Sequence, residues 1–218
     1  MRRYKLAVFD MDGTLLKGRG IFVIAEKLGF YDQLIKLFKY DRNDFYKKSI
    51  EIAKLTKGYS KKEFLDIFHE IPYQDHVEEV IKELKKQNII TGIVTDSYQI
   101  LADDLKERLG FDYAFANNLI IKNGIITGEL EIHNTNLKKD FCSERIYSIC
   151  KSCVLEKLCN DLGITVNKAV AVGDGIVDIG MIKKAGLGIA FKASPEVQKH
   201  ADIVTNDLRD VLKYISGE

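Results

Sequence analysis

Short apolar runs recur along the 218-residue chain and alternate with stretches whose apolar residues repeat about every third or fourth position. A short apolar run indicates a buried strand, and the longer repeat indicates an amphipathic helix. The helical repeat is clearest at Val77–Leu84, Leu101–Leu109 and Val154–Leu162. Strands that alternate with helices are typical of a mainly parallel sheet covered by helices on both faces. The strands are predicted at Lys5–Phe9, Ile89–Thr95, Tyr113–Ala116, Lys168–Val172, Leu187–Ala190 and Ile203–Val204.

Two segments interrupt this alternation. Residues 15–74 contain no good strand pattern and indicate several helices, which is too much chain for one loop between a strand and a helix. We therefore expect a helical cap domain at 15–74, inserted into an α/β core formed by 1–14 and 75–218. Asn123-Gly124 between apolar runs is a strong hairpin signal, so a small β-hairpin is expected at Leu119–Ile126. The predicted fold is α/β and Rossmann-like.

Composition excludes several classes of protein. Hydrophobic residues make up 46% of the chain and charged residues 30%, as in ordinary globular domains. The net charge of +1 gives no overall field that would favour nucleic acid. No apolar run approaches the roughly 20 residues of a membrane span, and the basic N-terminus is followed by a run too short for a signal peptide. We expect a cytoplasmic protein with neither a nucleic-acid nor a membrane partner; a homodimer is left open.

The four cysteines cluster at Cys142, Cys150, Cys153 and Cys159. Cys150 and Cys153 form a C-x-x-C motif, but a zinc site would require a second such pair or histidines at matching spacing. The favoured prediction is reduced thiols on a helix that starts near residue 150. A metal-binding or redox role is the alternative.

Acidic residues follow two of the predicted strands. Asp10 and Asp12 come directly after the first strand, and Asp174 and Asp178 follow the strand that ends at Val172. Because the carboxyl ends of parallel strands meet at one edge of the sheet, these carboxylates are expected to lie together at a ligand site. Buried charges are costly unless a cation or a reaction uses them.

The residue types in this set are those of phosphoryl transfer. Carboxylates are hard oxygen ligands that suit Mg²⁺ rather than zinc. Once a metal neutralises part of the charge, one free carboxylate can act as a nucleophile. Thr95 at the end of another strand offers a hydroxyl, and Lys151 near a predicted helix start offers a cation for phosphate oxygens.

The order of these motifs carries a resemblance to a known family. Asp-x-Asp-Gly-Thr at 10–14, a strand-terminal threonine, a lysine and Gly-Asp-Gly-x-x-Asp at 173–178 follow one another along the chain. This order resembles the haloacid dehalogenase superfamily of aspartate-nucleophile phosphatases and covers nearly the whole chain. The segments 171–187 and 112–117 resemble its phosphoserine-phosphatase branch, which carries a cap domain where 15–74 is inserted. The resemblance implies Mg²⁺ as cofactor and a small phosphorylated metabolite as substrate.

The resemblance also implies roles for the candidate residues. Asp10 would attack the phosphorus, and Asp12 would protonate the leaving oxygen and then deprotonate water. Asp12 would offer the metal only its backbone carbonyl. Asp174 would bind Mg²⁺ directly, and Asp178 directly or through water. Thr95 and Lys151 would hold the transferring phosphoryl group.

Several residues depart from the pattern of that branch. Val177 replaces an asparagine, and Arg19 lies where a glutamate would pair with the substrate amine. The cap arginine that would hold the serine carboxylate has no clear equivalent in 46–53. Asp96, next to Thr95, adjoins the phosphate pocket, where its charge is unexpected unless its side chain points away. These departures argue against phosphoserine, and Arg19 indicates a ligand with additional negative charge.

The sequence therefore predicts a Mg²⁺-dependent phosphomonoester phosphatase that acts through an aspartyl-phosphate. A phosphotransferase or phosphomutase would share the same chemistry up to that intermediate. A catalytically weak member that only binds a phosphorylated ligand is a further alternative.

Overall fold

The fold is built on a seven-stranded sheet with the strand order β4-β3-β2-β1-β5-β6-β7. In the computed structural model, which describes residues 4–39 and 44–216, all neighbouring strands are parallel except β3 and β4. The predicted α/β fold with a mainly parallel sheet is confirmed. The strands are β1 (Leu6–Phe9), β2 (Ile90–Tyr98), β3 (Tyr113–Lys122), β4 (Ile125–Glu131), β5 (Ala169–Gly173), β6 (Leu187–Phe191) and β7 (Ile203–Thr205).

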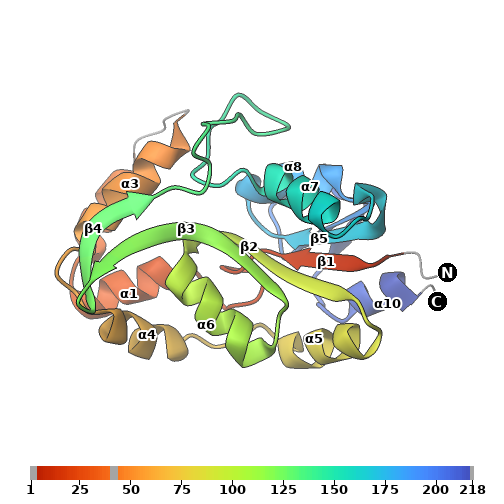
Figure 1. The fold of residues 1–218 in the computed structure, drawn as a ribbon, viewed down its shortest axis with the longest axis horizontal. Coiled ribbons are helices and arrows are strands. Elements are labelled where there is room, and N and C mark those ends of the chain that lie inside the picture. The colour runs from red at the N-terminus through yellow and green to blue at the C-terminus, as the bar shows by residue number, and fades with distance from the viewer. Residues whose placement is uncertain (1–3, 40–43, 217–218) are drawn as a thin grey trace.

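Strand β1 shows why the sheet needs helices on both faces. All four of its residues are buried, and successive side chains point to opposite faces. Ala7 and Phe9 belong to one apolar cluster, whereas Leu6 and Val8 belong to another. The first cluster includes α5, α6 and α10, and the second includes α7 and α8, on the two sides of the sheet (Figure 1). The bounds are α5 (Val77–Lys86), α6 (Gln99–Leu109), α7 (Lys151–Asp161), α8 (Ile179–Lys184) and α10 (Asp210–Ser216).

The chain between β1 and α5 is helical, as expected. It forms α1 (Gly20–Leu28), α2 (Tyr31–Phe38), α3 (Phe45–Leu55) and α4 (Lys61–His69). Ser60 begins α4 with a capping box, in which Ser60 and Glu63 satisfy each other's backbone amides. Phe64 and Phe68 of α4 lie in the same apolar cluster as Leu101 of α6, so these helices share a core with the sheet. The division into a cap at 15–74 and a core stays a prediction.

The predicted hairpin is present and extends the sheet. Asn123 and Gly124 both have positive φ, +51° and +77°, as its tight turn requires. β3 is one continuous strand from Tyr113, so the expectation that it ends at Ala116 was wrong. The hairpin also contacts the helical segment, because the Gly58 N–H donates to the Ile126 carbonyl at 2.9 Å.

The cysteine prediction needs correction. Cys150 and Cys153 are joined in a disulfide with their Cα atoms 5.2 Å apart, whereas Cys142 and Cys159 are free. Cys150 is the N-cap residue of α7 and Cys153 lies in its first turn. One helical turn brings the two residues within the Cα separation at which a disulfide forms. The expectation of a helix starting near residue 150 is confirmed, but that of four reduced thiols is wrong.

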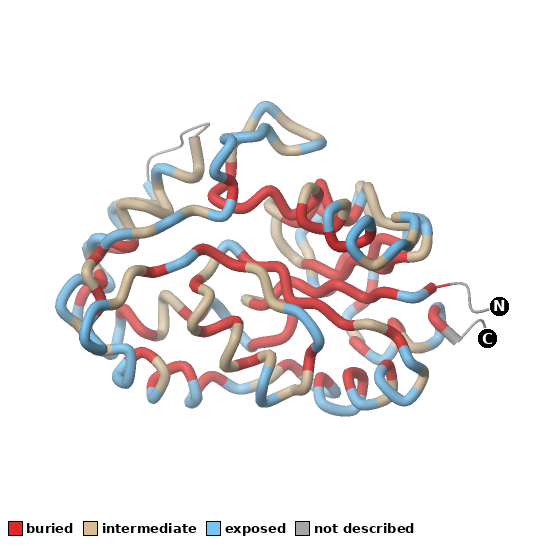
Figure 2. Tube along the Cα trace, in the orientation of Figure 1, coloured by how far each residue is buried: buried red, intermediate tan, exposed pale blue. Residues whose placement is uncertain are grey.

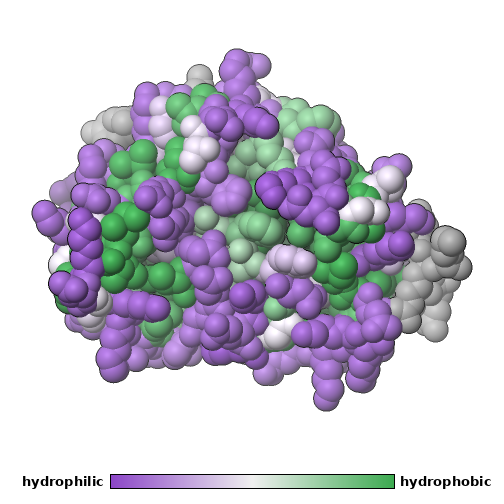
Figure 3. Space-filling view, viewed as in Figure 1, coloured by the Kyte–Doolittle hydropathy of each residue, from purple (hydrophilic) through white to green (hydrophobic). Residues whose placement is uncertain are grey.

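The burial pattern and the surface are those of a globular α/β protein. The central strands are buried along their length (Figure 2). Hydrophilic side chains cover much of the face in Figure 3, with apolar patches between them. In residues 4–39 and 44–216, no helix combines the length and apolar character required to cross a bilayer. Three short helices complete the fold: η1 (Val166–Lys168), η2 (Ile176–Asp178) and α9 (Pro195–Gln198).

Candidate active site

Three carboxylates meet at the carboxyl edge of the sheet. Asp10 follows β1, Asp174 follows β5, and Asp178 ends η2. One carboxylate oxygen from each lies within 4.8 Å of the other two. Burial raises the pKa of Asp10 above its usual range despite the opposing charge of Lys151, and the carboxylates of Asp178 and Asp174 raise it further. Burial, with Asp178, also raises the pKa of Asp174 to about 6.

Lys151 lies beneath this cluster. Its ammonium donates hydrogen bonds to the carboxylates of Asp10 and Asp178, the second at 2.6 Å. Its side chain is fully buried. Burial alone would lower the pKa of Lys151, but Asp10 and Asp178 raise it above its usual value, so the side chain is charged. When all three carboxylates of the cluster are ionised, they and the Lys151 ammonium together carry a net charge of −2. A divalent cation with a preference for oxygen ligands, such as Mg²⁺, matches this charge and donor set.

The backbone fixes the orientation of Asp178. One of its carboxylate oxygens accepts from Lys151, and the other accepts from the Asp174 and Gly175 amides at 3.1 and 2.9 Å. These three bonds hold the carboxylate and leave a lone pair on the oxygen that accepts from Lys151. The contact of Asp178 with a metal, directly or through water, stays a prediction.

Asp12 occupies a separate position beside the cluster. Its carboxylate accepts a hydrogen bond of 2.6 Å from the amide of Gly20, the first residue of α1. Burial raises the pKa of Asp12 to about 6, although the Gly20 hydrogen bond opposes the shift. Among the described residues, the group of carboxylates close enough to share a metal comprises Asp10, Asp174 and Asp178. The Asp12 side chain therefore lies outside this group.

The turn after β1 brings Gly13 against Asp174. Gly13 has φ of +96°, and a Cβ at this position would lie 2.5 Å from an Asp174 carboxylate oxygen. The next residue, Thr14, donates its hydroxyl to the other Asp174 oxygen at 2.7 Å. A close approach of backbone to carboxylate therefore helps to set the position of Asp174.

We expect Gly13→Ala to weaken Mg²⁺ binding at least about tenfold, because the new methyl group must displace Asp174. Gly29→Ala is the matched control: Gly29 also has positive φ, +81°, but nothing lies within 4 Å of its added Cβ. Both variants therefore place an alanine at positive φ, so both carry backbone strain. Titration calorimetry with Mg²⁺ measures the difference, and equal affinities for the two variants would contradict this role of Gly13.

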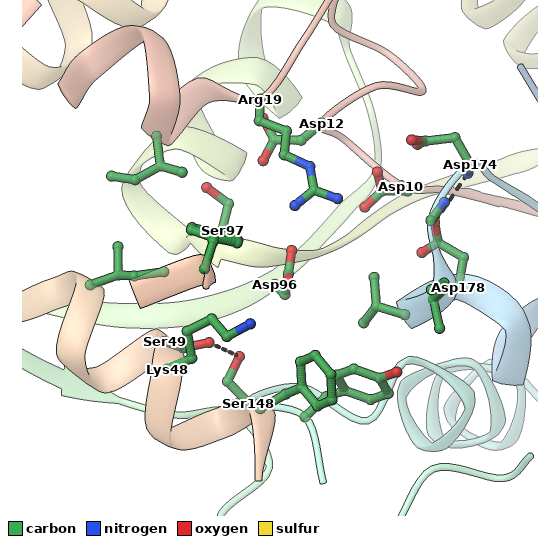
Figure 4. Close-up of a pocket in the computed structure, with 18 of the residues that line it drawn as sticks. Asp10, Asp12, Arg19, Lys48, Ser49, Asp96, Ser97, Ser148, Asp174 and Asp178 are labelled. Atoms are coloured by element: carbon green, nitrogen blue, oxygen red, sulfur yellow. Dashed lines mark hydrogen bonds between the residues drawn. The ribbon is translucent and has the colours of Figure 1, made fainter. Parts of the chain in front are cut away.

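A cavity of about 400 Å³ opens above the cluster and extends under α3. Arg19, Asp96 and Lys48 face it together with Asp10, Asp12 and Asp174 (Figure 4). The sequence suggested that the charged Asp96 side chain would have to point away from the phosphate pocket. In the structure it faces the pocket. Val177 also lines the cavity.

Thr95 and Lys151 are placed differently from the other candidates. Both are buried below the pocket wall rather than lining it. The Thr95 hydroxyl accepts a hydrogen bond from the Ser97 amide at 3.2 Å. Its direct contact with a phosphoryl group stays a prediction.

The sequence did not identify several residues of the pocket wall. Lys48 and Ser49 come from α3, and Arg145, Tyr147 and Ser148 come from the segment between β4 and α7. Lys48 lies over the Phe45 ring at 4.9 Å, and the Arg145 guanidinium lies over the same ring at 5.2 Å. These residues follow no spacing rule, since the tertiary fold alone brings them to the site. The cluster of basic and aromatic residues in 45–48 was the available signal.

Comparison with known proteins identifies the family. A model of haloacid dehalogenase-like hydrolases matches residues 7–183. The chain is 36% identical over 219 residues to phosphoserine phosphatase of Methanocaldococcus jannaschii. The alignment covers 98% of this chain and 99% of that protein. It is 31% identical over 216 residues to phosphoserine phosphatase of Campylobacter jejuni, covering 97% and 99% of the two chains.

A solved structure of a phospho-aspartyl intermediate analogue of phosphoserine phosphatase is similar to the whole chain. It superposes with a TM-score of 0.81 at 36% identity, covering 98% of this chain and 100% of that one. Substrate-bound phosphoserine phosphatase gives a TM-score of 0.82 at 35% identity, covering 99% and 100%. The chain belongs to the haloacid dehalogenase-like hydrolases and is a phosphatase similar to the phosphoserine phosphatases.

Proposed function

We propose that this phosphatase hydrolyses small phosphomonoesters in a Mg²⁺-dependent reaction that passes through an aspartyl-phosphate on Asp10. The observation that carries the proposal is the buried group of Asp10, Asp174 and Asp178, with Lys151 donating to two of them. In this proposal Asp10 and Asp174 hold Mg²⁺ directly, and Asp178 holds it directly or through water. When bound, Mg²⁺ would neutralise charge on the carboxylates and on the phosphoryl oxygens.

The first step is attack of an Asp10 oxygen on the phosphorus. The bond between phosphorus and the leaving oxygen breaks, and Asp12 transfers its proton to that oxygen. The raised pKa of Asp12, about 6, supports this role because part of the Asp12 population is protonated near neutral pH. Lys151 keeps the Asp10 carboxylate in place.

The second step returns the enzyme to its starting state. Asp12, now ionised, accepts a proton from a water molecule that attacks the phosphorus. The bond between phosphorus and Asp10 breaks, and inorganic phosphate is released. The first step requires Asp10 to be ionised and Asp12 to be protonated, and the ammonium of Lys151, which donates a hydrogen bond to Asp10, favours the ionised form of Asp10.

A panel of phosphomonoesters with and without Mg²⁺ tests the activity. We expect release of inorganic phosphate that depends on Mg²⁺ and is lost with EDTA. Assays with added acceptor alcohols separate hydrolysis from phosphotransfer, because a transferase would give phosphorylated alcohol at the expense of phosphate. Binding of phosphomonoesters without any turnover would contradict the proposal.

Mg²⁺ is expected to raise the melting temperature more at pH 7.5 than at pH 5. The pKa of Asp174 is about 6 and that of Asp10 is also raised, so protons compete with Mg²⁺ at the lower pH. In the metal-free protein the raised pKa values favour the folded state at low pH. That contribution is lost as pH rises through about 6, so metal-free stability falls as the Mg²⁺ effect grows.

Thermal scans at both pH values, with and without Mg²⁺, measure this effect. Saturating Mg²⁺ at about 100 times its dissociation constant would stabilise the fold by about 2.7 kcal/mol. Asp174→Asn should abolish the response, whereas Asp161→Asn on the exposed side of α7 should retain it. An equal shift at both pH values would contradict the assignment of these ligands.

The positive charges on the pocket wall favour a substrate with a second anionic group. Arg19, Lys48 and Arg145 line the cavity beyond the carboxylate cluster. The described residues of the wall include one acid besides Asp12 and the three carboxylates of the cluster, and this acid is Asp96. The three cations therefore outnumber it three to one. Phe45 and Tyr147 supply an apolar surface between the cations. Arg19 would repel the ammonium of phosphoserine.

Paired substrates test this preference. We expect kcat/KM at least about tenfold higher for 3-phosphoglycerate than for glycerol 3-phosphate, which lacks the carboxylate. Lys48→Met should reduce that ratio, whereas Lys54→Met, exposed on the same helix and outside the pocket wall, should leave it unchanged. Phosphoserine as the best substrate of a panel of sugar, nucleotide and lipid phosphates would contradict this substrate class.

A further inference from the structure

The disulfide at the start of α7 encloses Lys151. Cys150 precedes Lys151 directly, and Cys153 follows it by two positions, in the first turn of the helix. We propose that Cys150 and Cys153 form a reversible thiol–disulfide modification site whose oxidised state holds Lys151 against Asp10. The consequence for turnover rests on the function proposed above, whereas the position of Lys151 can be tested without it.

The disulfide joins two parts of the site. Cys150 ends the segment that carries Arg145, Tyr147 and Ser148 to the pocket wall. Cys153 belongs to the helix that begins with the buried Lys151. A covalent link between them restricts the first turn of α7 relative to that segment. Reduction therefore removes a restraint on both the pocket wall and the lysine.

The surroundings of the two sulfur atoms differ in a way that suits thiol exchange. Cys150 is buried, with 5% of its surface exposed, whereas Cys153 is half-buried. An incoming thiolate therefore reaches Cys153 more readily. The Ser152 hydroxyl lies 3.5 Å from Cys150 Sγ, and both sit at the N-terminus of an 11-residue helix. The hydroxyl and the helix end can stabilise a thiolate on Cys150 as it leaves.

The exchange requires a dithiol reductant and is balanced. One thiolate of the dithiol attacks Cys153 Sγ, the bond between the two cysteine sulfurs breaks, and Cys150 leaves as a thiolate. The second thiolate of the reductant then attacks the mixed disulfide and releases Cys153. The protein gains two electrons and, after protonation, two thiols, while the reductant becomes a cyclic disulfide.

Dithiothreitol in varied ratios of its reduced and oxidised forms tests the site in the full chain. Alkylation followed by peptide mass spectrometry should show Cys150 and Cys153 changing state together. Labelling with an amine-reactive reagent reports the position of Lys151 independently of catalysis. We expect Lys151 to react at least about fivefold faster in the reduced protein. Lys157, exposed on the same helix, is the internal control and should react equally in both states.

Turnover should follow the same titration, with kcat at least about threefold lower in the reduced protein. Cys153→Ser should behave like the reduced protein in every mixture, whereas Cys142→Ser should keep the full response because Cys142 is a free thiol outside the disulfide. If Cys153→Ser does not fold, the titration of the wild-type chain carries the test.

Three results would overturn the proposal: cysteines that remain thiols in every mixture, Lys151 labelling that does not respond to reduction, or equal kcat in both states. Failure of the phosphatase proposal is distinguishable, because it would appear as no turnover in either state. The Lys151 labelling would still decide between a redox-sensitive and an insensitive site in that case.

Discussion

Asp10→Asn is expected to lower kcat by about 10⁴-fold or more while the protein remains folded. An amide nitrogen or oxygen cannot replace the carboxylate as the attacking group. Asparagine nevertheless has nearly the same shape, and Lys151 keeps its second partner, Asp178. The loss should therefore fall on the chemical step rather than on the fold.

Steady-state kinetics with the best substrate of the panel measure this loss, and a thermal scan checks the fold. Asp161→Asn is the matched control, since Asp161 is an exposed aspartate on α7 paired with Lys157. The control should retain full activity. An Asp10→Asn enzyme with more than about a tenth of wild-type turnover would rule out Asp10 as the nucleophile.

Lys151→Met is expected to damage both catalysis and stability. The substitution removes the ammonium that keeps the Asp10 carboxylate in place, and a misplaced reacting group can lower the rate by about 10²-fold. The substitution also leaves Asp10 and Asp178 buried beside each other without their cation. Breaking a buried ion pair from one side costs about 3 kcal/mol or more, so the free energy of unfolding of the metal-free protein should fall by this amount.

Lys157→Met separates the buried role from a general effect of removing a lysine from α7. Lys157 is exposed and pairs with Asp161 one turn along the same helix. Such a surface pair contributes about 1 kcal/mol or less, so urea unfolding and kcat should both stay close to wild type. Equal effects of the two substitutions would contradict the role assigned to Lys151.

The sheet could be predicted from the sequence because each core strand is a buried apolar run. The extent of β3 could not, because Asn117 interrupts its apolar pattern. In the structure Asn117 is buried and donates to the Asp96 carbonyl at 2.7 Å and to Ser148 Oγ at 2.9 Å. Its side-chain oxygen accepts from the His133 amide at 3.0 Å. Partners distant in sequence therefore satisfy a polar residue that looked like the end of a strand.

Part of the candidate site could likewise be predicted from the sequence, and part could not. The carboxylates follow strand ends, so the parallel topology alone was enough to predict that Asp10 and Asp174 meet. Lys48 and Arg145 reach the pocket from a helix and from a segment without regular structure, and no spacing along the chain relates them. The cysteine pair was visible as C-x-x-C, but only the helical turn that brings its Cα atoms to 5.2 Å indicates a disulfide.

Trapping the phosphoenzyme shows whether Asp10 is the nucleophile. The protein is mixed with Mg²⁺ and substrate, quenched in acid within one turnover and analysed by peptide mass spectrometry. We expect one phosphoryl group per chain, on the peptide that contains Asp10, and none in Asp10→Asn. Turnover without a phosphorylated peptide in the wild type, or a phosphoryl group on any other residue, would contradict the role of Asp10.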